Sequence, residues 1–496
     1  MRIALINVQC LEGNNIVPPM GLLMVAAQLE RDGHSIRAFD IDPDEEDIIS
    51  SVTAFDPSII GLGFLTNTYD KAKRLLAKLK RSLPRSKTVL GGAHSSSVPL
   101  ETFKNLRPDY LIAGEGEITM SRLCKALERD ITSDLSNLDG LYYWRNEAVS
   151  FTGPPVPIEH LDELPFPARR LLDFERYLTS PGIMRGYAMD KMTTIITSRG
   201  CPYPCSFCAS NKVFGRKIRN RSVKNVIAEI RLLSAEYGIK GFYICDDLFT
   251  SNSKWVLSFC EALLKEPVKY RWACQSRVDT LSSGLARSMG ESGCAQIDFG
   301  VESGSTSTLE KLNKKTLNDN VVSLFRMLRE AGIRSCATFI IGNPDETEKD
   351  IEDTYGLAKS LKADFTVFYY STPYPGTSLH TMALDKGWLD DKTPYSSGWN
   401  HRQACLPLMD AGIGRERLAA LRRSMQNHFY FRNYFNIRNL IFLCSVFYSS
   451  LLHPSGTIKA VTTFFPVGRL DDLVEGLLIN HRRHINIRAM STLDHR

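Results

Sequence analysis

The stretch that decides the fold is "TTIITSRGCPYPCSFCAS", residues 193–210, in which an apolar run ends at a glycine and three cysteines follow at once. Cys201, Cys205 and Cys208 form a C-x3-C-x2-C array among turn-forming residues. Iron-sulfur clusters are normally held by four thiolates in closely spaced loops, and structural zinc by four ligands, usually as two separated pairs. No second pair follows here, because the next cysteines stand singly. Three thiolates in one loop therefore predict a cluster with one iron left open to a small molecule.

The residues after this loop predict a parallel barrel or partial barrel. From 193 to about 380, six apolar runs alternate with helical segments, as βα units do. Active sites of such barrels collect at the carboxyl ends of the strands. Polar residues that stand at these predicted ends, beside the cysteines, are Asp246, Asp247, Glu302 and Asn343.

Residues 1 to about 130 show a second alternation of strands and helices, which predicts a doubly wound, Rossmann-like α/β domain with five parallel strands. Three of the predicted strands end in glycine pairs, in "GLG", "GG" and "GEG". Glycine at the carboxyl edge of such a sheet lets the backbone approach a flat or phosphate-bearing ligand. The chain has no G-x-G-x-x-G before the first helix and no G-x-x-x-x-G-K-[ST], so a nucleotide site loses its main support.

The predicted domain plan is therefore 1–130 for the Rossmann-like domain, 131–190 for a proline-rich linker, 191–390 for the partial barrel and 391–496 for a mostly helical C-terminal region. We expect this last region to cover the barrel mouth and the substrate. Its aromatic run "NHFYFRNYF" would suit a ring-bearing or apolar substrate, and packing against the barrel explains the same pattern.

Composition bounds the function classes. The net charge of +6 is small for 496 residues, so no nucleic-acid partner is expected. Twelve scattered cysteines favour a reducing cytoplasm, and "MRIALINVQC" is too short an apolar run for a secretory signal. No run reaches the roughly 18 apolar residues of a transmembrane helix. The nearest, 439–452, predicts a buried helix, with a membrane-surface contact or a cover over an apolar substrate as alternatives.

The cysteine loop after the first strand of a six-unit barrel resembles the signature of the radical S-adenosylmethionine enzymes. The resemblance implies that Cys201, Cys205 and Cys208 ligate a 4Fe-4S cluster, and that S-adenosylmethionine chelates the fourth iron. It implies reductive cleavage to methionine and a 5'-deoxyadenosyl radical, with an electron donor such as flavodoxin or ferredoxin. Phe207 matches the aromatic residue that lies against the adenine.

Other positions match the family less tightly. "CDDLF" stands where a Gly-Gly-Glu-like motif is usual, so Asp246 or Asp247 would accept hydrogen bonds from the methionyl ammonium. "GVESGS" resembles the segment that contacts ribose and carboxylate, through Glu302 and Ser303. "IIGNPDET", with Asn343, resembles the motif that passes near the adenine, and Arg277 would pair with the carboxylate. Each of these residues has an alternative role as a strand-end cap or an ion pair.

The N-terminal segments "PPMGLLMVAAQLERDGHSIRAFD", "VLGGAHSSSVP" and "DYLIAGEGE" resemble the cobalamin-binding domain that is fused to one radical S-adenosylmethionine subfamily, the class B methyltransferase-like enzymes. The D-x-H-x-x-G loop that carries a cobalt-ligating histidine in some cobalamin proteins is absent, and His34 is expected to be a solvated turn residue. The resemblance implies cobalamin-pocket candidates that all lie at or near predicted strand ends: Thr66, Gly91, Gly92, His94, Gly114 and Glu115.

The combination implies transfer of a methyl group to an unactivated carbon of a natural-product or lipid-type intermediate. Ring formation, ring contraction and rearrangement remain open, because no residue of the sequence separates them. A transfer-RNA methylthiotransferase shares the barrel motif, but its N-terminal domain carries three cysteines, where this chain has only Cys10 and Cys124. A non-catalytic cobalamin-binding protein would not need the open cluster site.

Overall fold

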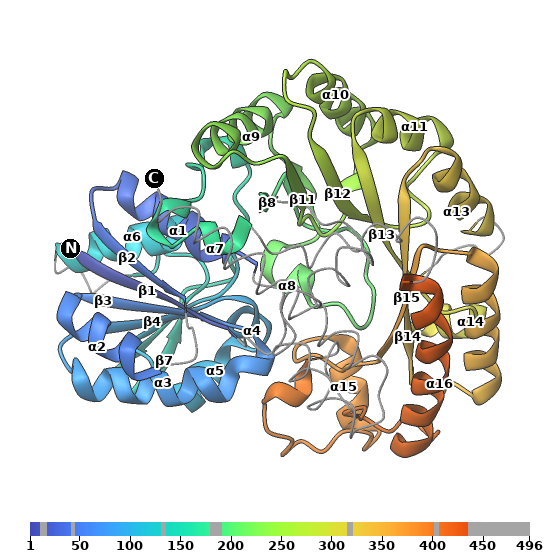
Figure 1. The fold of residues 1–496 in the computed structure, drawn as a ribbon. Coiled ribbons are helices and arrows are strands. Elements are labelled where there is room, and N and C mark those ends of the chain that lie inside the picture. The colour runs from blue at the N-terminus through green and yellow to red at the C-terminus, as the bar shows by residue number, and fades with distance from the viewer. Residues whose placement is uncertain are drawn as a thin grey trace, which may run out of the picture.

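The structure is a computed structural model of the chain. It describes residues 1–9, 17–40, 45–129, 135–178, 191–314, 321–400 and 406–434. The apolar segment 439–452 and Cys10 lie outside these ranges. Two sheets organise the molecule, one in an N-terminal unit and one in a curved unit that follows it (Figure 1).

The N-terminal sheet has the strand order β2-β1-β3-β4-β5-β6-β7. The first five strands of this order are parallel, as the sequence predicts. Their apolar runs are nearly continuous because helices cover both faces of the sheet. The strands are β1 (Arg2–Val8), β2 (Ser35–Asp40), β3 (Ile59–Phe64), β4 (Lys87–Gly91), β5 (Tyr110–Ile112), β6 (Leu141–Arg145) and β7 (Ala148–Phe151).

The hairpin β6–β7 corrects the predicted linker. Residues 141–151 pair antiparallel with β5 and with each other, and they extend the sheet. Asn146 and Glu147 both take positive φ at the turn between the strands. The prolines on which the linker prediction rested come later, at 154, 155, 157, 165 and 167. The two strands of this hairpin mix polar and aromatic residues, so they lack the regular alternation that would have predicted them from the sequence.

Helices pack on both faces of this sheet and build two separate apolar cores. Helices α1 (Met20–Arg31) and α6 (Gly116–Glu128) cover one face. The other face is covered by α2 (Glu45–Phe55), α3 (Tyr69–Ser82) and α5 (Pro99–Leu106). In α3 the buried residues Ala72, Leu75, Leu76 and Leu79 follow the spacing of one helical face. The carboxyl ends of the strands are left free by this packing and form one edge.

The second sheet has six parallel strands in the order β15-β14-β13-β12-β11-β8, so β8 and β15 are its two edge strands. All six predicted βα units are present in the described chain. The strands are β8 (Met192–Ile195), β11 (Gly241–Ile244), β12 (Arg271–Ser276), β13 (Cys294–Glu302), β14 (Arg334–Ile341) and β15 (Phe365–Tyr370). A separate short pair is formed by β9 (Ser198–Arg199) and β10 (Arg219–Asn220).

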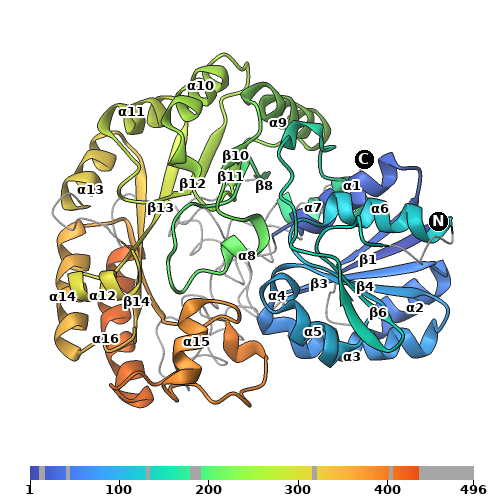
Figure 2. The same ribbon diagram turned by 180° about the vertical axis from the view of Figure 1, so that it is seen from behind.

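Helices line the outer side of the curved sheet, whereas α8 (Ser210–Phe214) lies on its inner side and faces the N-terminal unit (Figures 1 and 2). The outer helices share one large apolar core with the strands. They are α9 (Val223–Tyr237), α10 (Ser253–Leu264), α11 (Ser283–Glu291), α13 (Val321–Glu330) and α14 (Glu348–Leu361), and the short helix α12 (Thr306–Lys311) follows β13. The three cysteines lie between β9 and α8, and therefore at the inner side.

The Arg-rich helix α16 (Arg415–Tyr434) takes the position that the packing alternative for its pattern describes, while residues 401–405 and 435–496 of the predicted covering region lie outside the described chain. It packs against β15, the edge strand. Gln426 Oε1 accepts a hydrogen bond from the Phe368 amide at 3.0 Å, and Arg422 Nε donates to the Phe368 carbonyl at 2.9 Å. An unpaired strand edge must satisfy its backbone groups, and side chains of α16 do so here.

The segment around α15 (Ser378–Asp385) takes the inner position instead. It builds a small apolar cluster with Leu389, Trp399 and Met409, against which Phe207 of the cysteine loop packs. Leu379 N also donates to Ser206 O at 2.9 Å. Among the helices described, none combines the length and apolar character that a bilayer-spanning segment requires.

Candidate functional site

The cysteine loop begins at a glycine that no other residue can replace without movement. Gly200 has φ +92°, and a Cβ added to it would lie 2.3 Å from the Lys217 carbonyl oxygen. Arg199, just before it, pairs with Arg219 in the β9–β10 ladder, and Cys201 N donates to Gly215 O at 3.3 Å. The loop is therefore pinned at its start by backbone contacts with residues 215–219.

The three thiols suit a cluster better than a single ion. All three are free, and Cys208 is exposed while Cys201 and Cys205 are half-buried. Among the described residues, no three His, Cys, Asp or Glu side chains converge closely enough to hold one metal ion. In a four-iron cluster each thiolate binds a different iron, so the sulfurs need not meet at one point. The donor set, three thiolates in one short loop, fits such a cluster with one iron lacking a protein ligand.

Two cations act on Cys205. Burial raises the pKa of this thiol, while the positive charges of Lys314 and Arg277 oppose that effect. Arg277 Nη1 lies 3.8 Å from the Cys205 sulfur, and its guanidinium stacks 3.6 Å from the centre of the Tyr203 ring. The same guanidinium binds both carboxylate oxygens of Asp279, at 2.9 and 2.8 Å. Arg277, which the family resemblance implied as a partner of the S-adenosylmethionine carboxylate, is thus already anchored beside the cysteines.

Asp246 and Asp247 are adjacent but have different surroundings. Asp246 is buried and accepts hydrogen bonds from the Thr197 amide and the Ser198 hydroxyl, each at 2.6 Å. It therefore holds the backbone between β8 and β9. Asp247 is exposed, and its negative charge adds to burial in raising the pKa of the half-buried Cys201. Of the two carboxylates, only Asp247 faces the cysteines with free hydrogen-bonding capacity.

We expect the two aspartates to give opposite results when changed to alanine. Asp246→Ala removes the acceptor of three buried donors, the Thr197 amide and the Thr197 and Ser198 hydroxyls. This loss should destabilise the barrel by about 3 kcal/mol. Asp247→Ala should leave the thermal unfolding midpoint unchanged and weaken S-adenosylmethionine binding. Calorimetry and anaerobic equilibrium dialysis measure the two effects. A lower midpoint for Asp247→Ala, with unaltered binding, would reverse the assignment.

Glu302 is a strained residue beside Cys205. It is not a glycine, yet its φ is +68°, and its buried carboxylate accepts from Lys314 Nζ at 2.6 Å. Lys314 also donates to Gly300 O at 2.7 Å. Residues held at positive φ cluster at functional sites. Its neighbour Ser303 is fully buried and bonds Thr354 Oγ1 at 2.9 Å, so its hydroxyl supports the loop rather than the open site.

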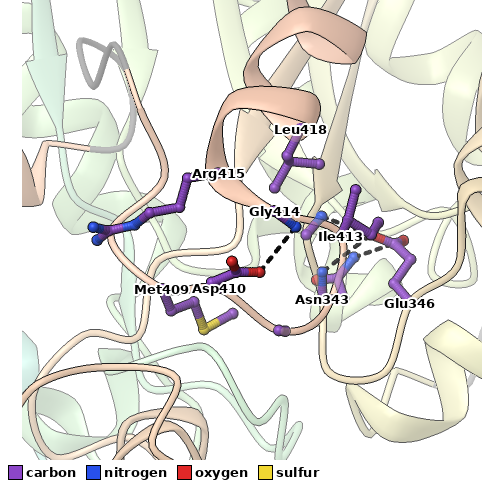
Figure 3. Close-up of a pocket in the computed structure, with 10 residues that line it drawn as sticks. Asn343, Glu346, Met409, Asp410, Ile413, Gly414, Arg415 and Leu418 are labelled. Atoms are coloured by element: carbon purple, nitrogen blue, oxygen red, sulfur yellow. Dashed lines mark hydrogen bonds between the residues drawn. The ribbon is translucent and has the colours of Figure 1, made fainter.

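Asn343 lies in a different pocket (Figure 3). Its Nδ2 donates to Ile340 O at 2.8 Å and to Glu346 Oε1 at 3.1 Å, and burial raises the pKa of Glu346. Asn343 Oδ1 is buried without a hydrogen-bond partner in the described part of the chain. The far wall of this small pocket comes from residues 409–418, and none of the three cysteines is among its lining residues.

Glycines form an open edge on the N-terminal sheet. A Cβ on Gly63 would meet nothing within 4 Å, and one on Gly91 only the Ile112 carbonyl oxygen at 3.9 Å. Gly92 has φ +91° and starts the short helix α4 (Ala93–Ser97). Gly114 has φ +79°, and its amide donates to Ser96 Oγ of α4 at 2.9 Å. Open backbone at Gly63 and Gly91, the ends of β3 and β4, fits the broad, flat ring of cobalamin. A Cβ on Gly92 or on Gly114 would instead lie 3.1 Å from Phe64 N or 2.7 Å from Pro155 Cβ.

His94 is buried beneath this edge. Its Nδ1 lies 3.0 Å from Thr66 Oγ1, and its Nε2 has no partner among the described residues. Aromatic rings surround it, with centroids 5.5 Å away for Phe64, 5.0 Å for Tyr69 and 4.9 Å for Tyr395. Tyr395 comes from the C-terminal segment, and no feature of the sequence indicated this contact. His34, expected to be solvated, is also buried, and its Nδ1 is 3.3 Å from Glu128.

The burial of His94 predicts a pH dependence. Burial lowers its pKa from 6.5 to about 4. Below pH 6.5 the unfolded chain takes up a proton that the folded protein refuses until about pH 4, so stability falls across this window as the pH falls. The full loss attributable to this shift is about 3 kcal/mol. Denaturant unfolding of the cofactor-free protein and of His94→Gln at pH 7 and pH 5 isolates the effect. Equal losses in both proteins would contradict it.

Glu115 points away from the open edge and into the interface between the two units. Its carboxylate is buried and pairs with Arg199 Nη1 at 2.6 Å and with Arg219 Nη2 at 2.5 Å. Glu117 pairs with Arg199 Nη2 at 2.5 Å. Glu115 is therefore not free to bind a ligand at the glycine edge. The sequence missed the arginines because they lie far from it in the chain and match no motif.

The two units face each other across short helices. Helix α4, which follows Gly92, packs against α8, which follows Cys208. Gly376, in "YPGT" after β15, approaches the N-terminal unit so closely that a Cβ would lie 2.3 Å from Ser97 O. The glycine edge and the cysteine loop are thus brought together by contacts on both sides.

Comparisons with known proteins agree with this arrangement. The Radical SAM superfamily matches residues 195–358 and the B12 binding domain matches residues 6–124. An uncharacterized methyltransferase, PH0819 of Pyrococcus horikoshii, is 32% identical over 84% of this chain and 88% of its own length. The anaerobic magnesium-protoporphyrin IX monomethyl ester cyclase of Rubrivivax gelatinosus is 29% identical over 76% of this chain and 68% of its own.

Among solved structures, the cobalamin-dependent S-adenosylmethionine radical enzyme OxsB, with aqua-cobalamin and S-adenosylmethionine bound, superposes with a TM-score of 0.68. The match covers 95% of this chain and 72% of that one at 16% identity, which shows a shared fold. Matches to both domains, and a methyltransferase relative along most of the chain, identify the cofactors as a 4Fe-4S cluster, S-adenosylmethionine and cobalamin. The chain therefore belongs to the cobalamin-dependent radical S-adenosylmethionine methyltransferase family.

Proposed function

We propose that the protein methylates an unactivated carbon of a small natural-product or lipid-type molecule held between its two cofactors. The observation that carries this proposal is the placement of α4 against α8. This contact sets the glycine edge of the N-terminal sheet opposite the cysteine loop of the barrel. A substrate between them would meet one cofactor on each side.

The cysteine loop supplies the binding groups on the barrel side. Cys201, Cys205 and Cys208 would hold the cluster, and the exposed carboxylate of Asp247 would accept hydrogen bonds from the methionyl ammonium. Arg277 would act on Cys205, because its guanidinium is fixed by Asp279 and Tyr203 at 3.8 Å from the sulfur.

The N-terminal edge supplies the second set of contacts. Gly63 and Gly91 leave room for a flat ring, and the Thr66–His94 pair lies beside them. When bound, the cofactors supply hydrogen abstraction from a carbon and a methyl group for it. The protein has to fix the carbon between them and exclude water.

The apolar side chains beside the cysteine loop support an apolar substrate, because the rings of Phe207 and Tyr374 are only partly buried there. Phe207 packs on a cluster built by Leu379, Ala383, Trp399 and Met409, and Tyr374 joins the same cluster. Apolar and aromatic walls with few polar groups are typical of sites for small organic molecules.

Oxidative cyclisation is the second candidate, because a relative along three quarters of the chain is named as a cyclase. Both reactions need an electron donor, and a flavodoxin or ferredoxin in the cytoplasm is the proposed source. They differ in the fate of the methyl group, which only a methyltransferase moves into the product.

The first test is anaerobic reconstitution. Iron, sulfide and bound cobalamin are measured after addition of hydroxocobalamin, and 5'-deoxyadenosine is measured after reduction with S-adenosylmethionine. Candidate acceptors are then incubated with S-adenosylmethionine carrying a deuterated methyl group. Deuterium in the product supports methylation, whereas an unlabelled, oxidised product supports cyclisation. A cluster and S-adenosylmethionine cleavage without cobalamin binding would refute the methylation proposal.

A further inference from the structure

A buried network of four charges joins the two cofactor domains directly at the cysteine loop. It consists of Arg199 and Arg219 from the barrel side and Glu115 and Glu117 from the N-terminal domain. The exposed fractions of the side chains are 2%, 2%, 1% and 4%, and the three ion pairs measure 2.5 to 2.6 Å. Two positive and two negative charges balance within the network, as burial of ionised groups requires.

On each side, the network lies next in the chain to residues of a proposed cofactor site. Glu115 follows Gly114 at the end of β5, and Gly114 is tied to α4 through Ser96 at 2.9 Å. On the other side, Arg199 is separated from Cys201 only by Gly200. Because Gly200 is wedged against the Lys217 carbonyl, the peptide between Arg199 and Cys201 has little freedom to adjust.

The geometry of Arg199 makes it the link. Its two terminal nitrogens bind different carboxylates, one on Glu115 and one on Glu117. Its guanidinium also lies over the ring of Phe214 of α8, 5.4 Å from the centre. This planar fork, held at three points, connects the N-terminal strand end to the backbone that carries Cys201.

We propose that Arg199 is a positioning residue that couples cobalamin binding in the N-terminal domain to the conformation of the cluster loop. Cobalamin then binds more tightly to the protein that holds its cluster than to the cluster-free protein. Coupling is reciprocal, so cobalamin also changes the environment of the cluster. The inference rests on the cofactor placement proposed above and is independent of the methyl acceptor.

The test compares cobalamin affinity in two forms of each protein. Hydroxocobalamin dissociation constants are measured anaerobically by equilibrium dialysis, with and without the reconstituted cluster, and the electron paramagnetic resonance spectrum of the reduced cluster is recorded with and without hydroxocobalamin. In the native protein we expect the hydroxocobalamin dissociation constant to be at least about fivefold lower with the cluster than without it. We also expect hydroxocobalamin to shift the electron paramagnetic resonance spectrum of the reduced cluster.

Arg199→Lys keeps the charge but loses the fork, so it should bind both cofactors with a ratio of dissociation constants near one and an unshifted spectrum. Arg221→Lys is the matched control. Arg221 is equally buried and pairs with Glu229 inside the barrel, so this variant should keep the native ratio. Glu117→Gln, which leaves the Arg199–Glu115 pair in place, should reduce the ratio and decides the question if Arg199→Lys does not fold.

Equal cobalamin affinity in both forms of the native protein overturns the proposal. The proposal is also overturned if Arg199→Lys keeps the native ratio of the two dissociation constants. If Arg199→Lys does not fold, the native ratio in Glu117→Gln overturns it. A native protein that binds no cobalamin in either form refutes the cofactor placement along with the coupling.

Discussion

Cys205→Ala should abolish both the 4Fe-4S absorbance and the formation of 5'-deoxyadenosine. Removal of one thiolate leaves two irons without a protein ligand, and neither Cys201 nor Cys208 can supply the missing bond. The carboxylates nearest to Cys205, those of Glu302 and Asp279, are already paired with Lys314 and Arg277 and do not replace the thiolate. Iron and sulfide per chain, the visible spectrum and product formation under reduction measure the effect.

Cys260→Ala is the matched control for this variant. Cys260 is fully buried on α10 in the outer core, where burial raises the pKa of its thiol to about 12. This variant removes a thiol of the same kind from the packing and should retain cluster, cleavage and product. Undiminished product formation by Cys205→Ala would refute the radical mechanism.

Gly200→Ala should have the second largest effect, although it adds only a methyl group. That methyl would stand 2.3 Å from the Lys217 carbonyl oxygen and 3.0 Å from its carbonyl carbon, both of which are backbone atoms. A side chain can rotate away from such a clash, but backbone cannot, so the β9–β10 pair has to separate. An alanine at φ +92° adds backbone strain to this clash. We therefore expect the free energy of unfolding to fall by about 3 kcal/mol or more, and poor cluster incorporation.

Gly332→Ala separates the two causes. Gly332 also has a positive φ, +73°, but a Cβ there meets nothing within 4 Å. This variant carries the backbone strain without the clash, and it should lower the thermal midpoint slightly and leave the cluster intact. Equal iron content and equal midpoints for the two variants would contradict the steric explanation for Gly200.

Features that depend on residues close together in the chain could be predicted from the sequence. Strands β1 and β3 are buried on both faces and appear as apolar runs, and α3 shows its buried stripe at helical spacing. The three cysteines are close in the chain, so their spacing alone predicts a common loop. The same local rule placed Asp246 and Asp247 at a strand end, but it could not separate their roles.

Contacts between residues far apart in the chain could not be predicted from these local patterns. The hairpin β6–β7 and helix α16 are defined by what they pair with, an exposed sheet edge in each case. The sequence left two alternatives open for the aromatic residues of helix α16, contact with a substrate and packing against the barrel. Its polar side chains satisfy the backbone of β15, a demand that exists only once the sheet has formed.

The sequence by itself determined two cofactor domains, the order of their strands and helices, and the loop of three thiols, because these depend on residues near one another in the chain. Tertiary structure alone decided which groups meet across the domains. Arg199 and Glu115 are 84 positions apart, and so are buried against each other only through folding. Their pairing follows from the cost of burying a charge without a partner, which acts on the folded arrangement rather than on any local pattern.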